Sequence, residues 1–306
     1  MHKKIILIPV LSIILTAFVL ADNNLIGVNE SGSAIINADY KLNGENYKAG
    51  ILENSLVRLV VLPDFGGRVI EYSLKSNGHN QFEPSGGNPG LKDIIGENGE
   101  SDYTKGNYFC QNVYQLKVLN AEKGVSFLAS ASTDYVKVER IMTLDPGSTR
   151  LNIKIKYTNI GSEIIEKFKI RVHPSINAGG NDTADDIIVV PEKEKIIRDA
   201  KENDYRPDCG WWLAFDKKEK ETLLMTFDPS EMDDIYVYRP GNSYNMEYFG
   251  KPIDAKKGDS VSLNINYYIL TEKGQVERLL KSGKINVADK ETPRIINEIN
   301  RLYDSK

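Results

Sequence analysis

Hydrophobic and polar residues alternate along most of the chain between about residues 36 and 270. In the segment LNIKIKYTN, residues 151–159, every second side chain is apolar, beginning with Leu151 and ending with Tyr157. A period of two is typical of an antiparallel strand with one buried face. The segment VSLNINYYI, residues 261–269, repeats this pattern. The turn-forming residues DPGS lie between DYVKVERIMTL and the first of these strands, and they predict a hairpin.

Further short strands are predicted along the same region. They are VRLVVL, RVIEYSL, GVSFLAS, GWWLAF, ETLLMTF and DIYVYR. No stretch here shows a sustained helical period, and turn residues separate the strands. Many short strands at this spacing favour a β-sandwich or barrel. We therefore expect an all-β fold, a large antiparallel β-sandwich made by residues 22–272.

Helical patterns occur only near the carboxyl end, in residues 273–306. GQVERLLKSG predicts a short helix that Gly283 stops, and TPRIINEINRLYD predicts a longer one. In the longer segment Thr292 is suited to cap the helix and Pro293 to its first position. Its apolar side chains share one face: Ile295, Ile296, Ile299 and Leu302. We expect this tail to pack its apolar stripe against the sandwich.

The first 21 residues have the features of a signal peptide. Lys3 and Lys4 precede an apolar run, and Val19 and Ala21 fit the small-residue pattern of a cleavage site. Pro9 and the polar sequence after the run argue against the alternative, an uncleaved membrane anchor. The pattern predicts a secreted or periplasmic protein with no membrane association after cleavage.

The charge composition of the chain argues against nucleic acid as a partner. The formal net charge is -4 and acids and bases are interspersed, so there is no basic stripe for nucleic acid.

Cys110 and Cys209 either form one disulfide or remain as two buried thiols. With one usable histidine they do not complete an ordinary zinc site. Residues 181–186, NDTADD, offer carboxylates to calcium without the spacing of a known calcium loop, so we expect neither metal nor cofactor.

A long run of turn-forming residues interrupts the strands at residues 76–107. Roughly thirty such residues inside a compact domain are usually functional or mobile. Two interpretations remain open: a solvated loop over the sandwich, or a loop that forms one wall of a ligand site.

His173 is the main candidate for proton transfer. In EKFKIRVHP the apolar face carries Phe168, Ile170 and Val172, so Arg171 and His173 lie on the other face. Pro174 is expected to end the strand and direct the chain into a polar loop. Histidine, with an unperturbed pKa near 6.5, is suited to give or take a proton at neutral pH. The alternative is a neutral histidine facing solvent at a strand end.

Glu247 is the candidate partner of His173. It lies in SYNMEYFGKPID, where Tyr244, Met246 and Tyr248 form the apolar face and Glu247 lies on the other. Taken alone, a glutamate exposed on a strand is unremarkable.

Three segments in this order resemble the galactose mutarotase-like superfamily: residues 52–74, 151–163 and 172–180. In that superfamily a strand ending in T-N-x-G precedes an H-x-Y-F-N segment that carries the catalytic histidine. His173 and Asn177 match this segment, although a serine and an isoleucine replace its aromatic pair. The resemblance extends over roughly residues 45–270, nearly the whole mature chain.

A second element of the resemblance is a later strand that carries a glutamate followed shortly by P-D. Glu247, with Pro252 and Asp254 behind it, is similar to this element. LPDFGGRV is most similar to poorly characterised members rather than to the aldose 1-epimerases. Those enzymes also carry an early N-x-L-H-G-G segment with a further histidine, and this chain has none. The resemblance therefore does not extend to this part of the epimerase site.

The resemblance implies a saccharide partner and an acid–base mechanism without a cofactor. A glutamate, here Glu247, would take the proton of the anomeric hydroxyl while His173 protonates the ring oxygen. Arg68 and Arg171 are expected to bind the substrate, with Asn177. Trp211 and its neighbour in sequence point to opposite faces of their strand, so one is core and the other a candidate sugar platform. The pattern does not decide between the two, and Trp211 is included in the predicted site.

Three hypotheses for the function follow. The first is an exported aldose 1-epimerase-like isomerase that uses His173 and Glu247, and the second is a non-catalytic saccharide-binding protein. The third is a structural or adhesion sandwich with no sugar site. The isomerase hypothesis requires that His173 and Glu247 come within about one sugar ring of each other.

Overall fold

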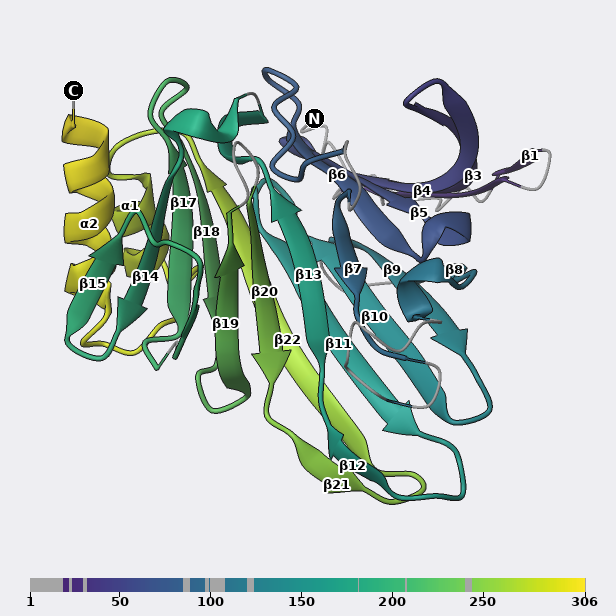
Figure 1. Cartoon of the computed structure of the whole chain (residues 1–306). Helices are drawn as coiled ribbons and strands as arrows, with labels where there is room; N and C mark the ends of the chain where they lie inside the picture. Colours follow the sequence, from purple (N-terminus) through teal and green to yellow (C-terminus); the bar gives the residue numbers. More distant parts are fainter. Residues whose placement is uncertain are drawn as a thin grey trace, which may run out of the picture.

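The computed structural model describes side chains in residues 32–84, 89–96, 99, 108–119, 124–180, 182–206, 208–239 and 244–305, and the backbone of 19–21 and 24–29. Two large antiparallel sheets face each other (Figure 1). This confirms the predicted all-β sandwich.

The larger sheet has eleven strands. Their order is β1 (Val19–Ala21), β2 (Asn24–Asn29), β3 (Gly32–Leu42), β4 (Glu45–Glu53), β5 (Val57–Leu62), β6 (Arg68–Leu74), β7 (Leu91–Asp93), β13 (Arg171–Ile176), β20 (Tyr244–Gly250), β19 (Met232–Tyr238) and β16 (Asn203–Tyr205). Strands β7, β13 and β20 lie side by side in the middle of the face seen in Figure 1.

The second sheet has nine strands. Their order is β15 (Lys195–Arg198), β14 (Ile187–Glu192), β17 (Trp211–Asp216), β18 (Glu221–Phe227), β22 (Ser260–Leu270), β11 (Leu151–Asn159), β10 (Val136–Leu144), β9 (Val125–Ser132) and β8 (Gln115–Leu119). Strands β12 (Ile165–Phe168) and β21 (Ile253–Ala255) form a small separate pair at one end.

The period-two pattern explains the core between the sheets. Strands β11 and β22 pair in a register that places Ile153 opposite Ile265 and Ile155 opposite Leu263. All four side chains are buried in the cluster that fills the space between the two sheets. The polar positions between them face the other way, as expected for an antiparallel sheet.

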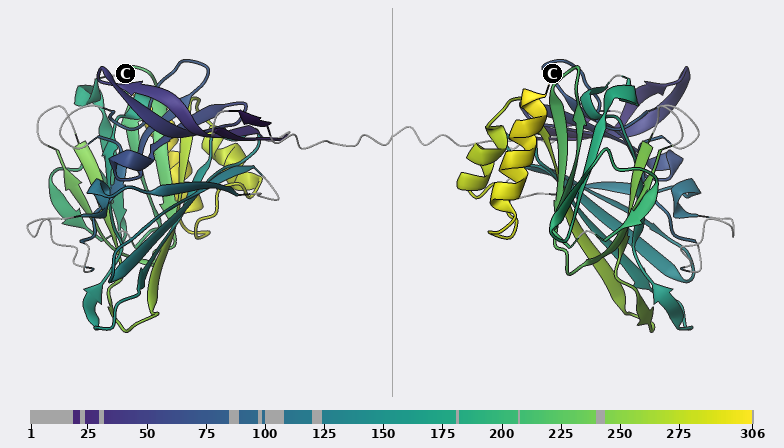
Figure 2. Two further views of the ribbon diagram at one scale, coloured as in Figure 1. Left: turned by 90° about the vertical axis from the view of Figure 1, so that its right-hand side faces the viewer. Right: turned by 60° about the vertical axis from the view of Figure 1, so that its left-hand side comes forward.

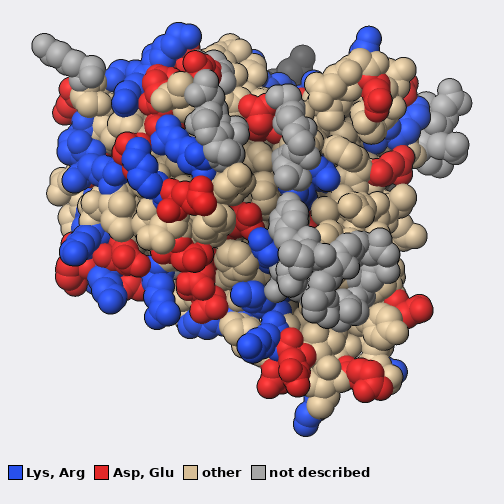
Figure 3. Space-filling view, in the orientation of Figure 1, with Lys and Arg blue, Asp and Glu red and all other residues tan. Residues whose placement is uncertain are grey.

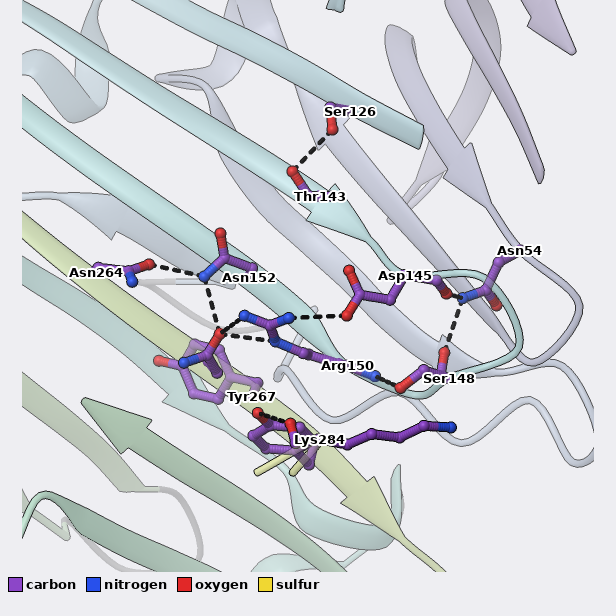
Figure 4. A network of polar contacts seen from close by, with 12 residues as sticks. Asn54, Ser126, Thr143, Asp145, Ser148, Arg150, Asn152, Asn264, Tyr267 and Lys284 are labelled. Atoms are coloured by element: carbon purple, nitrogen blue, oxygen red, sulfur yellow. Dashed lines mark hydrogen bonds and ion pairs between the residues drawn. The ribbon is translucent and has the colours of Figure 1, made fainter. Parts of the chain in front are cut away.

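The predicted DPGS hairpin joins β10 to β11, and polar contacts hold it against both sheets (Figure 4). Arg150 donates to Asn266 Oδ1 from Nε at 2.9 Å and from Nη2 at 2.7 Å, and it pairs with Asp145. The Asn54 side chain donates to the carbonyls of Asp145 and Ser148. Because Asn54 follows β4, these bonds fix one end of the larger sheet against the second sheet.

Two helices cover the outer face of the second sheet (Figure 2). Helix α1 spans Gln275–Lys281 and α2 spans Thr292–Asp304. The buried side chains Ile295, Ile299 and Leu302 pack in one cluster with β17. The predicted tail is confirmed, with one correction: Thr292 lies inside α2, and Glu291 occupies the cap position.

The predicted leader falls mostly outside the described residues, because residues 1–18 are not among them. Val19–Ala21 form β1 and pair with β2. Among the described residues, no helix has the length and apolar character needed to cross a membrane.

The two cysteines are not bonded to each other. Cys110 and Cys209 are both buried free thiols, and Cys209 belongs to the cluster beneath the helices. Of the two alternatives left open by the sequence, the structure has the unpaired one.

Part of the predicted loop at 76–107 is ordered into the larger sheet. Strand β7 lies between β6 and β13, and the 3₁₀ helix η2 (Phe109–Gln111) follows it. Residues 85–88, 97, 98 and 100–107 lie outside the described part. The segment thus supplies a central strand, which alternation could not reveal in three residues.

Candidate functional site

Five charged or titratable side chains meet where β6, β7, β13 and β20 lie next to one another. We call them the His173 cluster, and its members are Arg68, Lys92, Arg171, His173 and Glu247. They lie on the face opposite the core, since neighbours such as Val172 and Tyr248 belong to the core between the sheets. The predicted orientation of His173 and Glu247 away from the apolar stripe is confirmed.

Strand pairing sets this geometry. His173 lies opposite Lys92 in the register of β13 with β7. Pro174 does not end the strand as predicted, because β13 continues to Ile176 and Pro174 pairs with Leu91. The register of β13 with β20 omits His173 and Pro174, so the residue without an N–H lies at an interruption of that ladder.

His173 lies between a cation and a carboxylate. Its Nδ1 is 3.3 Å from Lys92 Nζ, and its Nε2 is 3.8 Å from Glu247 Oε1. Only 3% of His173 is exposed, so the alternative of a solvent-facing histidine is wrong. The two predicted acid–base residues are therefore well within one sugar ring of each other.

Glu247 is held by Arg171. Glu247 Oε2 accepts hydrogen bonds from Arg171 Nε at 2.9 Å and Nη2 at 2.8 Å. The guanidinium of Arg171 also lies over the Phe249 ring, 5.1 Å from its centroid. Arg171, predicted to bind substrate, is thus seen orienting the carboxylate, and charge-assisted bonds of this kind are strong and directional.

The charges within the cluster shift two pKa values. Burial, together with the positive charges of Lys92, Arg171 and Arg68, lowers the pKa of His173 to about 3. Burial, followed by the charge of Arg68, lowers the pKa of Lys92 to about 7. At neutral pH His173 is therefore neutral in the free protein.

Arg68 forms the edge of the cluster on β6. Its guanidinium lies 4.1 Å from the centre of the Phe65 ring, and Nη2 donates to the Cys110 carbonyl at 3.5 Å. Burial raises the pKa of the Cys110 thiol, while the charges of Arg68 and Lys92 oppose that rise. A thiol that stays protonated at neutral pH therefore lies next to the cluster.

Behind Lys92, the next residue anchors β7 from the core side. Asp93 is fully buried and pairs with Arg140 Nη2 at 2.5 Å. The hydroxyls of Tyr114 and Tyr157 each donate to Asp93 at 3.0 Å. Because neighbouring residues of a strand point to opposite faces, this buried network holds Lys92 toward His173.

The structure separates two predicted residues from this cluster. Asn177 lies beyond the end of β13, on the order of 13 Å along the chain from His173. Trp211 is fully buried beneath the helices and donates from Nε1 to Glu291 at 3.0 Å, so it is not a sugar platform. Its neighbour Trp212 is buried in the core between the sheets. Alternation placed the two rings on opposite faces correctly, but both faces of this strand are covered.

Lys92 is the residue that sequence reasoning missed. It is fully buried, yet it lies in a segment predicted to be loop. A weak signal was present, since LKDII places two charges between apolar residues in an otherwise polar stretch.

A separate group of carboxylates could hold a cation. Within the described residues, Asp185, Asp186 and Asp216 each offer an oxygen, all within 4.8 Å of one another. Asp186 Oδ2 accepts from the Tyr244 hydroxyl at 2.6 Å, and burial raises the pKa of Asp186 to about 8. Two of the three come from the segment 181–186 considered above for calcium.

The described side chains on the visible face carry mixed charge. In Figure 3, which views the molecule as in Figure 1, basic and acidic side chains are interspersed over this face. This agrees with the absence of a basic stripe in the sequence.

Comparisons with known proteins identify the fold. No protein-family model matches the sequence, and no curated protein matches it. Among solved structures, the Slr1438 protein from Synechocystis sp. PCC 6803 has a TM-score of 0.57 at 12% identity, covering 77% of this chain and 100% of that chain. Galactose 1-epimerase from Lactobacillus acidophilus NCFM has a TM-score of 0.55 at 11% identity, covering 76% and 97%.

A putative aldose 1-epimerase from Escherichia coli K12 has a TM-score of 0.54 at 11% identity, covering 72% of this chain and 98% of that chain. Together these matches show that the chain has the galactose mutarotase-like fold. At these identities the likeness establishes the fold, and the chemistry has to be argued from the His173 cluster.

Proposed function

We propose that this protein binds a saccharide at the His173 cluster and interconverts its anomers by acid–base chemistry. The observation that carries the proposal is the 3.8 Å separation of His173 Nε2 from Glu247 Oε1 on one strand pair. The anomeric hydroxyl and the ring oxygen of a sugar are bonded to the same carbon, so two groups this close can serve both.

The mechanism assigns opposite proton transfers to the two residues. Glu247 takes the proton of the anomeric hydroxyl, and His173 gives a proton to the ring oxygen. The bond from the anomeric carbon to the ring oxygen breaks, and an aldehyde forms. After rotation of the aldehyde, both transfers reverse and the ring closes. Arg171 keeps the carboxylate oriented through its two hydrogen bonds.

The electrostatics of the cluster support a site rather than structural packing. Three basic side chains lie around one histidine and one carboxylate. This environment lowers the pKa of Lys92 and of His173. Burying charge is costly unless a partner or function compensates, and such shifts concentrate at functional sites. The third hypothesis, a sandwich without a sugar site, does not account for these buried groups.

The test compares anomer exchange for the wild type, two variants of the cluster and one control variant. NMR exchange or polarimetry on freshly dissolved α-aldoses and sugar acids should show faster interconversion with the wild-type protein. His173→Ala and Glu247→Gln should each slow it roughly 10²–10⁴-fold. The matched control is His79→Ala, because His79 Nδ1 contacts Glu221 of β18 at 2.8 Å and lies outside the cluster. Equal rates for His173→Ala and wild type, with saccharide binding demonstrated, would refute the isomerase.

One observation favours the second candidate, a non-catalytic saccharide-binding protein. Glu247 Oε2 already accepts two hydrogen bonds from Arg171, so this oxygen is engaged by the protein itself. In that case His173→Ala should weaken saccharide binding in titration calorimetry while no protein changes the rate of anomer exchange.

We also propose that the protein is exported, on the basis of the leader pattern alone. The mature protein recovered from its host's secreted or periplasmic fraction should begin near Asp22. Amino-terminal sequencing checks this, and an intact Met1 on the recovered protein would contradict it.

A further inference from the structure

The Lys92 contact lies on the side of His173 away from Glu247. Lys92 Nζ is 3.3 Å from Nδ1, whereas Glu247 Oε1 is 3.8 Å from Nε2. A neutral imidazole has one nitrogen that donates and one that accepts. If the Lys92 ammonium donates to Nδ1, the ring proton is on Nε2, the nitrogen that faces Glu247.

We propose that Lys92 holds His173 as its Nε2–H tautomer and supplies, through Nδ1, the proton that His173 gives to the substrate. This inference rests on the proposed function. As Nε2 transfers its proton to the ring oxygen, Nδ1 takes a proton from Lys92 Nζ. Lys92 is left as a neutral amine, Glu247 holds the proton of the anomeric hydroxyl, and ring closure returns both. His173 never carries a net charge in this sequence.

The surroundings of Lys92 suit this role. It is fully buried, and the groups that act on it are Arg68 from β6, Cys110 from η2, and Glu247 from β20, besides His173. A lysine can give up a proton in such a site, whereas an arginine cannot. The pKa of Lys92, about 7, means that protonated and neutral forms are both accessible near neutral pH. The charges of Arg68 and Arg171 next to His173 disfavour an imidazolium, so a relay through a neutral ring avoids that state.

The tautomer can be measured without any sugar. The chain has three histidines, so ring ¹⁵N NMR of uniformly labelled protein gives few signals, and His79→Asn assigns one of them. The expected result is a protonated Nε2 and an unprotonated, hydrogen-bonded Nδ1 for His173 at pH 7. A protonated Nδ1 in the wild-type protein would overturn the proposal whatever the protein does to sugars.

Variants of Lys92 distinguish its two proposed roles, which are to fix the tautomer of His173 and to supply a proton. Lys92→Met removes both roles and should lower kcat for anomer exchange about 100-fold or more with KM little changed. Lys92→Arg keeps a donor and should preserve the tautomer, yet it should lose exchange to a similar extent. The matched control is Lys169→Met, since Lys169 lies over Phe249 at 4.7 Å and should leave exchange unchanged. Full exchange by Lys92→Arg would overturn the proton supply.

If the Lys92 variants fail to fold, the pH dependence of anomer exchange by the wild-type protein still tests the relay. Exchange should fall as the pH rises through about 7, in parallel with the loss of the Lys92 proton followed by lysine side-chain NMR. A rate that stays level while Lys92 deprotonates would refute the relay. If the wild type exchanges no sugar, the proposed function fails and the relay fails with it. If it exchanges sugar but carries the Nδ1–H tautomer, only the relay fails.

Discussion

His173 differs from an ordinary surface histidine because burial and neighbouring charges disfavour its protonated form. An isolated histidine titrates near pH 6.5, but the pKa of His173 is lowered to about 3 by burial and by three neighbouring cations. Lys92 contributes one of those charges and also touches the ring. At the residue scale, therefore, the candidate acid works as a neutral group, and its behaviour follows from its neighbours.

This shift predicts how stability depends on pH. The folded pKa of His173 lies below the unfolded value, so the unfolded chain binds the extra proton between about pH 6.5 and 3. The contribution of His173 is complete above pH 6.5 and is lost as the pH falls, by at most about 1.4 kcal/mol per pH unit. Urea unfolding at pH 7, 5.5 and 4.5 should show a smaller loss for His173→Gln than for the wild type. Parallel losses in the two proteins would contradict the shift.

Strand β7 shows how a short element can position a site. Its three residues place Lys92 on the face of the His173 cluster and Asp93 in the core. Asp93 is held by Arg140 and Tyr157 from the second sheet. It is also held by Tyr114, which lies just before β8. The buried ion pair is therefore part of what fixes the cation next to His173.

Removing that anchor should both destabilise the protein and disturb the site. Asp93→Asn leaves Arg140 buried without its counter-charge, which should cost about 3–5 kcal/mol of unfolding free energy. Ring ¹⁵N signals of His173 should also shift as β7 moves. The control is Asp204→Asn, because Asp204 is exposed on the edge strand β16 and should change stability by less than about 0.5 kcal/mol. Equal stability of the two variants by urea unfolding would show that the Asp93 network does not anchor β7.

In the whole molecule, the two sheets carry different features on their outer faces. The larger sheet carries the His173 cluster, and the second sheet carries the two helices that bury Trp211. The space between the sheets is an apolar core interrupted by the Asp93–Arg140 pair. The helices therefore complete a second core, and the candidate site depends on them only through the stability of the sandwich.

A substitution under α2 should test this division. Ile299 is fully buried against the second sheet, so Ile299→Ala should lower the unfolding free energy by about 2–5 kcal/mol. Saccharide binding at 25 °C should be unchanged, because the cluster lies on the other sheet. Arg301→Ala, an exposed position on the same helix, is a control expected to lose less stability. A loss of binding in folded Ile299→Ala would contradict the independence of the two faces.

The sequence by itself determined the direction of most side chains, because alternation is a local property of an extended chain. It predicted the sandwich, the helical tail, and the orientation of His173 and Glu247 away from the core. It also separated Trp211 from its neighbour in sequence. It could not show that both faces of that strand are buried, because the face of Trp211 is covered by residues about 80 positions away in sequence.

Only the tertiary structure decided what surrounds His173. Lys92 is 81 residues from His173 in sequence, and Arg171 is 76 residues from Glu247, so no local pattern brings these charges together. Three residues of β7 are too few to show a period, although they place the cation beside the ring. The pKa of His173 depends on that proximity and on burial, because electrostatic interactions act through space and not along the chain.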